Sequence, residues 1–175
     1  YWRMERSLKL SAPPLLDEGL EIRVARTESD FRLCHQVQQS SFASHFGFVP
    51  RSFEEWYRLT TEAEGCDAEG VAVLFKSEVP VGFVECNNDN AHFNSGYING
   101  IGVIPSEQGK GYGELLLRWA IAHSAGLGYR RIELNVDAGN ESGALRLYEK
   151  TGFKPYLAWE QWHKPNWAAD LKSAK

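Results

Sequence analysis

The stretch from Gly96 to Gly113, GYINGIGVIPSEQGKGYG, constrains the fold more than any other part of the chain. It combines an alternating apolar run typical of a strand, a proline that ends it, and glycines at positions 109, 111 and 113. The next residues, ELLLRWAI, are strong helix formers. A strand, a glycine-rich loop and a helix start in this order place free backbone N–H groups at the positive end of a helix dipole, which favours phosphate binding.

The loop alone leaves other interpretations to consider. A Walker A loop needs a lysine followed by serine or threonine after its last glycine, and the chain has no such segment. A dinucleotide-binding fingerprint fits poorly, because the third glycine comes one residue too early and the acidic partner is missing. A glycine-rich turn that binds no ligand stays open on this evidence.

A second motif lies downstream, in LNVDAGNESGALRLYEKTGF, which begins at Leu134. The first motif, Q-x-x-G-x-G from Gln108, and this second one resemble the two signatures of the GNAT superfamily of acyl-CoA-dependent N-acyltransferases. One helix and one strand separate the motifs, as they do in that family, and the resemblance covers about residues 20 to 163. The matching residues of the second motif are Asn140, Ala144, Leu147, Tyr148, Gly152 and Phe153.

The resemblance implies an α/β fold: a mixed, mostly antiparallel sheet of six to seven strands with helices on both faces, splayed at a central strand over Gly96–Pro105. A length of 175 residues and a hydrophobic content of 43% fit one domain with its own core. We expect the acyltransferase domain at residues 20–165, a strand and proline-rich linker at 1–19, and a tail at 166–175.

Periodicity and capping residues place the elements of this domain. Thr27 and Asp30 resemble a helix start, and Ser52 with Glu55 forms a capping-box pattern. A turn over residues 77–80 joins two strands as a hairpin. The expected strands are 20–25, 71–76, 81–86, 96–104, 131–136 and 153–163, and the expected helices are 31–44, 52–64, 112–125 and 140–150, the last capped by Asn140.

The N-terminus echoes the last expected strand. Residues 1–7 and 156–162 both follow the pattern Y-x-x-bulky-E. The match is either chance or a sign that residues 1–10 close a preceding, similar domain, which would make the whole protein a tandem. A tandem resembles the mycothiol synthase branch of the superfamily, as do residues 42–53. Family members usually have two strands after the tyrosine helix; the missing one could come from residues 1–10, from a bend within 153–163, or be absent.

The resemblance also implies a binding site for acetyl-CoA as co-substrate. Its pyrophosphate would lie on the loop, where Lys110 either adds a charge or is solvated, and its pantetheine arm would lie along the central strand. An N–H near Ile101 would stabilise the thioester oxyanion. A glycine in mid-strand, Gly102, predicts a bulge or a close backbone approach. The expected cofactor-binding residues are Ile101, Gly102, Val103, Gln108, Gly109, Lys110, Gly111, Tyr112, Gly113, Asn140 and Tyr148.

Tyr148 stands where the family commonly places its general acid, so it would protonate the departing thiolate or only pack against CoA and donate to its sulfur. Asn140 caps its helix and could touch CoA as well. Glu85 is either a general base acting through water or a solvent-facing residue. Direct attack by an amine needs no cysteine nucleophile, so Cys86 is interpreted as packing; His92 and His123 likewise carry no expected role.

The acceptor site of this superfamily is built mainly by its first two helices and nearby loops. Tyr97 and Asn99 are further candidates for acceptor contacts. The aromatic residues of this region form either a substrate wall or plain core; they are Phe42, His45, Phe46, Phe48, Phe53 and Trp56.

Composition excludes some classes of function. A net charge of −4 with no basic run argues against nucleic acid as a partner. An odd count of three cysteines favours a reducing, cytoplasmic location, and the five histidines lack the spacing of metal ligands. No segment has the length of a membrane span or the pattern of a signal peptide.

The expected function is transfer of an acetyl group from acetyl-CoA to a primary amine of an unidentified small molecule or peptide. The alternative is a non-catalytic CoA-binding half of a tandem acetyltransferase. Intact loop glycines and an intact Tyr148 favour the active form.

Overall fold

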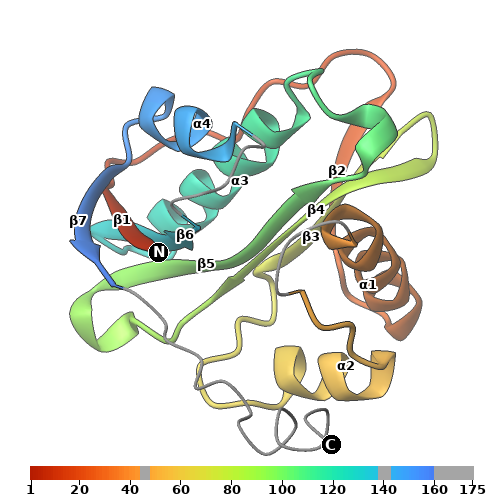
Figure 1. Ribbon diagram of the computed structural model, residues 1–175, viewed down its shortest axis with the longest axis horizontal. Helices are drawn as coiled ribbons and strands as arrows, with labels where there is room; N and C mark the ends of the chain where they lie inside the picture. The colour runs from red at the N-terminus through yellow and green to blue at the C-terminus, as the bar shows by residue number, and fades with distance from the viewer. Residues whose placement is uncertain (44–47, 138–142, 160–175) are drawn as a thin grey trace, which may run out of the picture.

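The computed structural model describes residues 1–43, 48–137 and 143–159. Seven strands and four α-helices, with two short 3-10 turns, make up this part of the chain (Figure 1). In chain order they are β1 (Trp2–Ser7), β2 (Leu20–Val24), α1 (Glu28–Phe42), α2 (Phe53–Thr61), β3 (Val71–Lys76), β4 (Val79–Asn87), β5 (Ser95–Val103), α3 (Tyr112–Gly126), β6 (Arg131–Val136), α4 (Ala144–Lys150) and β7 (Lys154–Ala158).

The strands form one sheet in the order β2-β3-β4-β5-β6-β1-β7. Every neighbouring pair is antiparallel except β5 and β6, which run parallel. The crossover between these two parallel strands contains α3, as a parallel connection requires. The mixed, mostly antiparallel sheet predicted from the resemblance is confirmed.

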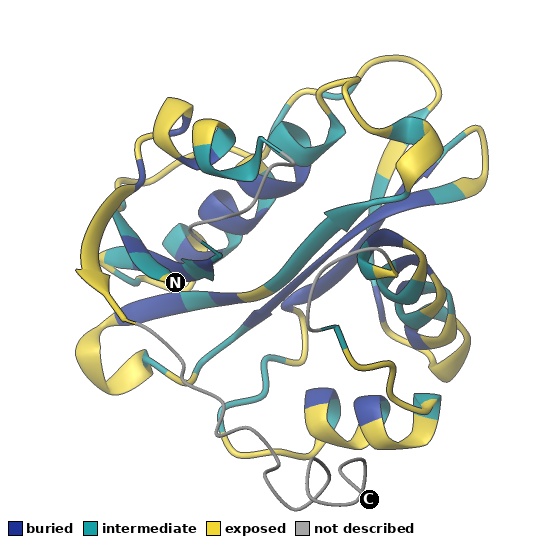
Figure 2. Cartoon of the chain, viewed as in Figure 1, coloured by how far each residue is buried: buried dark blue, intermediate teal, exposed yellow. Residues whose placement is uncertain are grey.

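Helices cover both faces of the sheet, as predicted. Helices α1 and α2 lie on one face and α3 and α4 on the other (Figure 1). Two buried apolar clusters fill these interfaces, one including Leu116 and Leu117 of α3 and the other including Phe31 and Trp56 of α1 and α2. Figure 2 shows the buried residues along the central strands and on the sides of α1 and α3 that face them.

Strand β1 takes the place between β6 and β7. Trp2 pairs with Val136 of β6 on one side and with Ala158 of β7 on the other. Met4 is completely buried in the cluster beneath α3, which anchors the strand. Of the three origins considered for the last strand, the structure therefore shows the first: residues 2–7 supply it.

Capping residues and turn conformations account for several boundaries of the helices and strands. Thr27 and Asp30 mark a helix start, as predicted, and they form a reciprocal capping box there. The β3–β4 turn is shorter than expected, because Ser77 and Glu78 both adopt positive φ and form the two-residue connection that suits a twisted hairpin. The expected cap of α4 is wrong: Gly143, in the left-handed conformation, occupies the N-cap position, and Asn140 lies outside the described residues.

The sheet splays along β5. This strand pairs with β4 from Tyr97 to Val103, but with β6 only from Ser95 to Ile98. The β4–β5 register shifts so that Glu85 faces Gly100 and Cys86 faces Ile98, which leaves Asn99 as the extra residue of a bulge. The bulge considered at Gly102 is therefore wrong.

The other prediction for Gly102, a close approach of neighbouring groups to its backbone, is confirmed. A Cβ atom there would lie 2.8 Å from the Phe83 ring and 2.8 Å from Cβ of Ser41. The glycine thus lets α1 and the Phe83 side chain pack directly against the central strand.

No helix among the described residues is long and apolar enough to cross a bilayer.

Candidate functional site

The gap that opens between β5 and β6 leads into a cavity of about 1030 Å³. This volume is at the upper end of what small-molecule sites use. Segments far apart in the sequence line it: the second half of β5, the glycine loop, the ends of α1 and β6, and α4. The lining residues used below are Tyr1, Ser41, Phe42, Phe48, Asn99, Ile101, Gly102, Val103, Gln108, Gly109, Gly111, Tyr112, Gly113, Asn135 and Tyr148.

The glycine loop presents a run of free donors. Gly109 and Gly111 adopt φ values of +76° and +85°, which favour glycine, and Gly111 is the N-cap of α3. The N–H groups of residues 109–113 donate to no described acceptor, whereas the N–H of Glu114 already bonds to the carbonyl of Gly111. Five consecutive free N–H groups at a helix N-terminus form a cradle for an anion such as a pyrophosphate.

The side chains of the loop have other partners. Lys110 Nζ lies 2.9 Å from Glu107 Oε2, the same carboxylate that Lys76 contacts, and Lys110 does not line the cavity. Gln108 Nε2 donates to the carbonyl of Val103 at 3.0 Å, which ties the loop to the end of β5. The cradle is therefore built from backbone, and the Lys110 charge is directed to Glu107.

On the side of the cavity no strand among the described residues pairs with the second half of β5, and there the carbonyl of Val103 accepts from Gln108 Nε2. The N–H of Ile104 donates to Val81, and successive residues of a strand direct their backbone groups to alternate sides. Ile101 and Val103 therefore direct theirs away from β4, where β6 no longer follows, whereas those of Gly102 face β4. Ile101 and Val103 can bind an extended amide-containing ligand; Gly102 contributes through its missing side chain.

Tyr148 reaches the cavity from α4. It is 7% exposed, and burial raises the pKa of its hydroxyl to about 12. Its hydroxyl has no hydrogen-bond partner among the described residues. The side chain is thus fully protonated at neutral pH and able to donate one proton or one hydrogen bond to a group in the cavity.

Glu85 lies behind the cavity wall. Only 5% of it is exposed, so the solvent-facing alternative is wrong. Its Oε1 accepts from Asn99 Nδ2 at 2.9 Å and from Thr60 Oγ1 at 3.2 Å, whereas Oε2 accepts no hydrogen bond of normal geometry from the described residues. Burial raises the pKa of the carboxyl, and the polar groups of Asn99, Thr60 and Trp56 oppose that rise. Asn99 lines the cavity and Glu85 does not.

The aromatic residues near α1 divide between wall and core. Phe42 and Phe48 line the cavity with ring centroids 5.8 Å apart. Trp56 is buried and Phe53 packs against its cluster, so both belong to the core. His45 and Phe46 lie outside the described residues.

Some residues of the cavity were not foreseen, and some candidates lie outside it. Ser41, Tyr1 and Asn135 line it but carried no expected role; β6, RIELNV, alternates polar and apolar residues, so its sequence did not single out Asn135. Tyr97 is absent from the lining. Burial raises the pKa of the Cys86 thiol, and His123 pairs with Asp67 at 2.7 Å. The described residues contain no cluster of potential metal ligands.

Comparisons of the sequence with known proteins identify a family and several relatives. Residues 32–153 match the model of the acetyltransferase (GNAT) family. Among curated proteins, a mycothiol acetyltransferase of Thermobispora bispora is 31% identical over 157 residues, which cover 87% of this chain and 52% of that protein. One of Kytococcus sedentarius is 29% identical over 160 residues, 87% and 53% of the two chains. The chain spans about half the length of these relatives.

Solved structures show the same fold. A GCN5-related N-acetyltransferase from Sphaerobacter thermophilus superposes with a TM-score of 0.74 at 26% identity, over 89% of this chain and 48% of that one. A GNAT family acetyltransferase from Brucella melitensis, in complex with acetyl-CoA, superposes with a TM-score of 0.61 at 21% identity, over 83% and 91%. Because the family model matches residues 32–153, more than half of the chain, this chain belongs to the GNAT family of acetyltransferases.

Proposed function

We propose that this chain transfers the acetyl group of acetyl-CoA to a primary amine of a small molecule or peptide, by direct attack of the amine. One observation carries the proposal: five free N–H groups at the start of α3, the edge of β5 beyond its pairing with β6 and the Tyr148 hydroxyl all border one cavity. A pyrophosphate, an amide-rich arm and a thioester follow one another in acetyl-CoA, in the order in which these three features meet the cavity.

The residues of the chain have separate parts in this reaction. The backbone of residues 109–113 would hold the pyrophosphate, and Ile101 and Val103 would pair with the pantetheine arm as a strand pairs with a peptide. The N–H of Ile101 is the donor proposed for the thioester carbonyl as negative charge develops on it.

Proton transfers complete the chemistry. The neutral amine forms the new C–N bond, the C–S bond breaks, and Tyr148 gives its proton to the leaving sulfur. The surplus proton of the amine passes to Glu85 through Asn99-bound water, or to solvent. Tyr148 suits the acid role because burial keeps it protonated, and Glu85 suits the base role because burial raises the pKa of its carboxyl and so makes the carboxylate more basic.

The name of the relatives, mycothiol acetyltransferase, makes an amine related to mycothiol one acceptor to test. The alternative, a CoA-binding half without catalysis, shares the cradle but predicts binding without turnover.

Thiol release from acetyl-CoA tests the proposal. Hydroxylamine serves as a small nitrogen nucleophile that enters any acceptor pocket, and a panel of amino sugars, polyamines and peptides follows. We expect catalytic turnover by the wild-type chain, and a loss of about 100-fold with Tyr148→Phe at unchanged acetyl-CoA affinity. Binding without turnover of any amine would favour the non-catalytic alternative, and no binding would refute both.

A further inference from the structure

Helix α4, which carries Tyr148, is held mainly at its C-terminal end. The helix has seven residues, too few to be stable alone. Its end forms a complete Schellman motif: the N–H of Phe153 donates to the carbonyl of Tyr148 at 2.9 Å, and the N–H of Gly152 donates to that of Glu149 at 2.9 Å. Gly152 adopts a φ of +88°, as the motif requires. Tyr148 is therefore itself the residue that the motif anchors.

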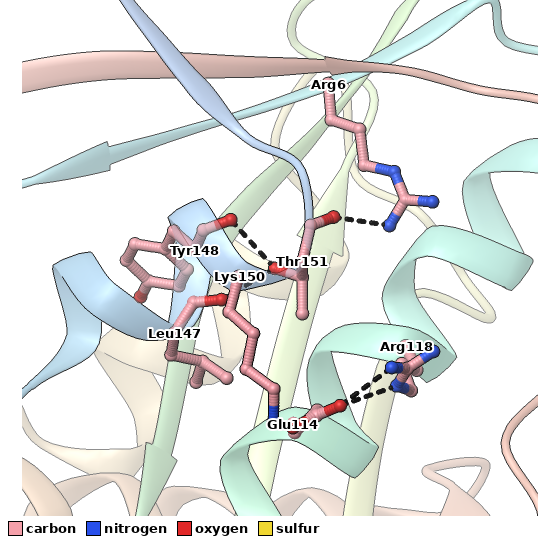
Figure 3. Close-up of polar contacts among 7 residues, drawn as sticks. All are labelled: Arg6, Glu114, Arg118, Leu147, Tyr148, Lys150 and Thr151. Carbon is pink, nitrogen blue, oxygen red and sulfur yellow. Dashed lines mark hydrogen bonds and ion pairs between the residues drawn. The ribbon is translucent and has the colours of Figure 1, made fainter.

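Side chains extend this anchor. Thr151 Oγ1 donates within the helix to the carbonyls of Leu147 and Tyr148 at 2.8 and 2.9 Å. The rings of Tyr148 and Phe153 pack with centroids 6.1 Å apart, the hydrophobic contact that accompanies such a cap. The carbonyl of Thr151 is left pointing away from the helix, toward β1 (Figure 3).

Arg6 of β1 binds the carbonyl of Thr151. Its Nη1 donates to the Thr151 oxygen at 2.7 Å, and its Nε lies within van der Waals distance of the position that a Cβ of Gly152 would occupy. Figure 3 shows the guanidinium directed at the end of α4. A cation there also opposes the negative end of the helix dipole.

Arg6 is an unexpected residue at this position. It shares its face of β1 with Trp2 and Met4, which pack in the apolar cluster beneath α3. Burial and the neighbouring Arg118 lower the pKa of its guanidinium, so holding the charge there has a cost. Arg118 is itself paired with Glu114, whose other oxygen holds Lys150 of α4 at 2.7 Å.

We propose that Arg6 is a positioning residue for the transfer reaction: by binding the Thr151 carbonyl it fixes the capped end of α4 and, through it, the Tyr148 hydroxyl in the cavity. The inference depends on the function proposed above for Tyr148. The N-terminal strand, which touches no part of the glycine loop in its sheet pairing, thereby contributes to catalysis and not to acetyl-CoA binding.

Kinetics with acetyl-CoA and hydroxylamine test this inference on the full chain. Arg6→Met is expected to lower kcat about tenfold, because small displacements of a catalytic group are costly, with the acetyl-CoA Kd unchanged within about twofold. Arg6→Lys keeps a cation at the helix end and should recover most of the rate. Arg23→Met, which removes another strand arginine with ion pairs, is the matched control and should leave kcat unchanged.

A double variant separates positioning from general stability. If Arg6 acts only through Tyr148, Arg6→Met combined with Tyr148→Phe should be no slower than Tyr148→Phe alone. Losses that multiply would overturn the inference. Thermal unfolding of each variant shows whether it is folded.

A spectroscopic readout keeps the inference testable even if the proposed function fails. In the chain labelled with 3-fluorotyrosine, Tyr148→Phe identifies the ¹⁹F resonance of Tyr148. That resonance should shift or broaden in Arg6→Met, return toward its original position in Arg6→Lys, and stay unchanged in Arg23→Met. An unchanged resonance in Arg6→Met overturns the positioning role whatever the activity, whereas absent turnover in the wild-type chain refutes the proposed function alone.

Discussion

The two halves of the cavity present different kinds of groups, backbone in one and side chains in the other. The half around the glycine loop presents backbone: free N–H groups of residues 109–113 and the edge of β5 beyond its pairing with β6. The half near α1 presents side chains, among them Phe42, Phe48 and Asn99. Backbone cradles need glycine and a helix start, so a short sequence motif indicates them. The side chains that contact an acceptor can differ with each acceptor, so no fixed sequence motif indicates them.

The largest effect that would sharpen this comparison is expected from Glu85→Gln, which removes the candidate base behind the side-chain half. If Glu85 accepts the amine's proton, kcat should fall about 100-fold and lose its rise with pH, while acetyl-CoA affinity stays the same. A pH–rate profile measures this. An unchanged profile would assign the proton transfer to solvent.

The same substitution has a stability signature. Burial raises the pKa of Glu85 above its ordinary value of 4.5, so the native state favours the protonated carboxyl. The corresponding stability is complete below about pH 4.5 and is lost as the pH rises through the native pKa. A glutamine does not ionise, so the thermal stability of Glu85→Gln relative to wild type should be higher at pH 8 than at pH 4.5. If the difference in melting temperature between Glu85→Gln and the wild-type chain were the same at both pH values, that result would contradict the pKa shift.

An intermediate effect is expected from Phe48→Ala in the aromatic wall. Phe48 packs against Phe42 at the cavity, and its removal should lower kcat/KM for a bulky amine about tenfold, or about 1.4 kcal/mol. Hydroxylamine, which needs no wall, should be acetylated at the wild-type rate. Equal losses with both acceptors would mean that Phe48 does not contact the acceptor.

The smallest effect is expected from Lys110→Ala in the backbone half. Because the Lys110 ammonium is directed to Glu107 and away from the cavity, its loss should weaken acetyl-CoA binding less than about threefold at 0.15 M salt. Calorimetric titration measures the difference. A much larger loss of affinity would show that the Lys110 side chain turns to the pyrophosphate when acetyl-CoA binds. The glycine-loop half of the cavity would then bind through a side chain as well as through backbone.

The same division explains what could be predicted from the sequence. The start of α3 at Tyr112 and the bounds of β6 agree with the prediction, because glycines, a proline and local periodicity decide them. The splayed, mostly antiparallel sheet, predicted with six to seven strands, was implied by the resemblance that the two motifs carry. These features depend on residues close together in the chain.

What could not be predicted depends on contacts between distant segments. The burial of Glu85 results from Thr60 and Asn99, which approach it from α2 and β5. The place of β1 between β6 and β7 is a choice of pairing that a short strand sequence does not specify, and the bulge at Asn99 is a matter of register. The cap of α4 was assigned to Asn140 by residue type, whereas the helix begins at Ala144 after Gly143.

Calorimetric titration of acetyl-CoA tests the central claim, the backbone cradle, most directly. The chain offers a matched pair: Gly111 and Gly128 lie at the two ends of α3, with φ of +85° and +84°, and neither has an atom within 4 Å of the Cβ position. Gly111→Trp and Gly128→Trp should therefore strain the backbone alike. We predict micromolar binding by the wild-type chain and by Gly128→Trp, and none by Gly111→Trp. Equal affinity in both variants, or no binding by the wild-type chain, would contradict the account.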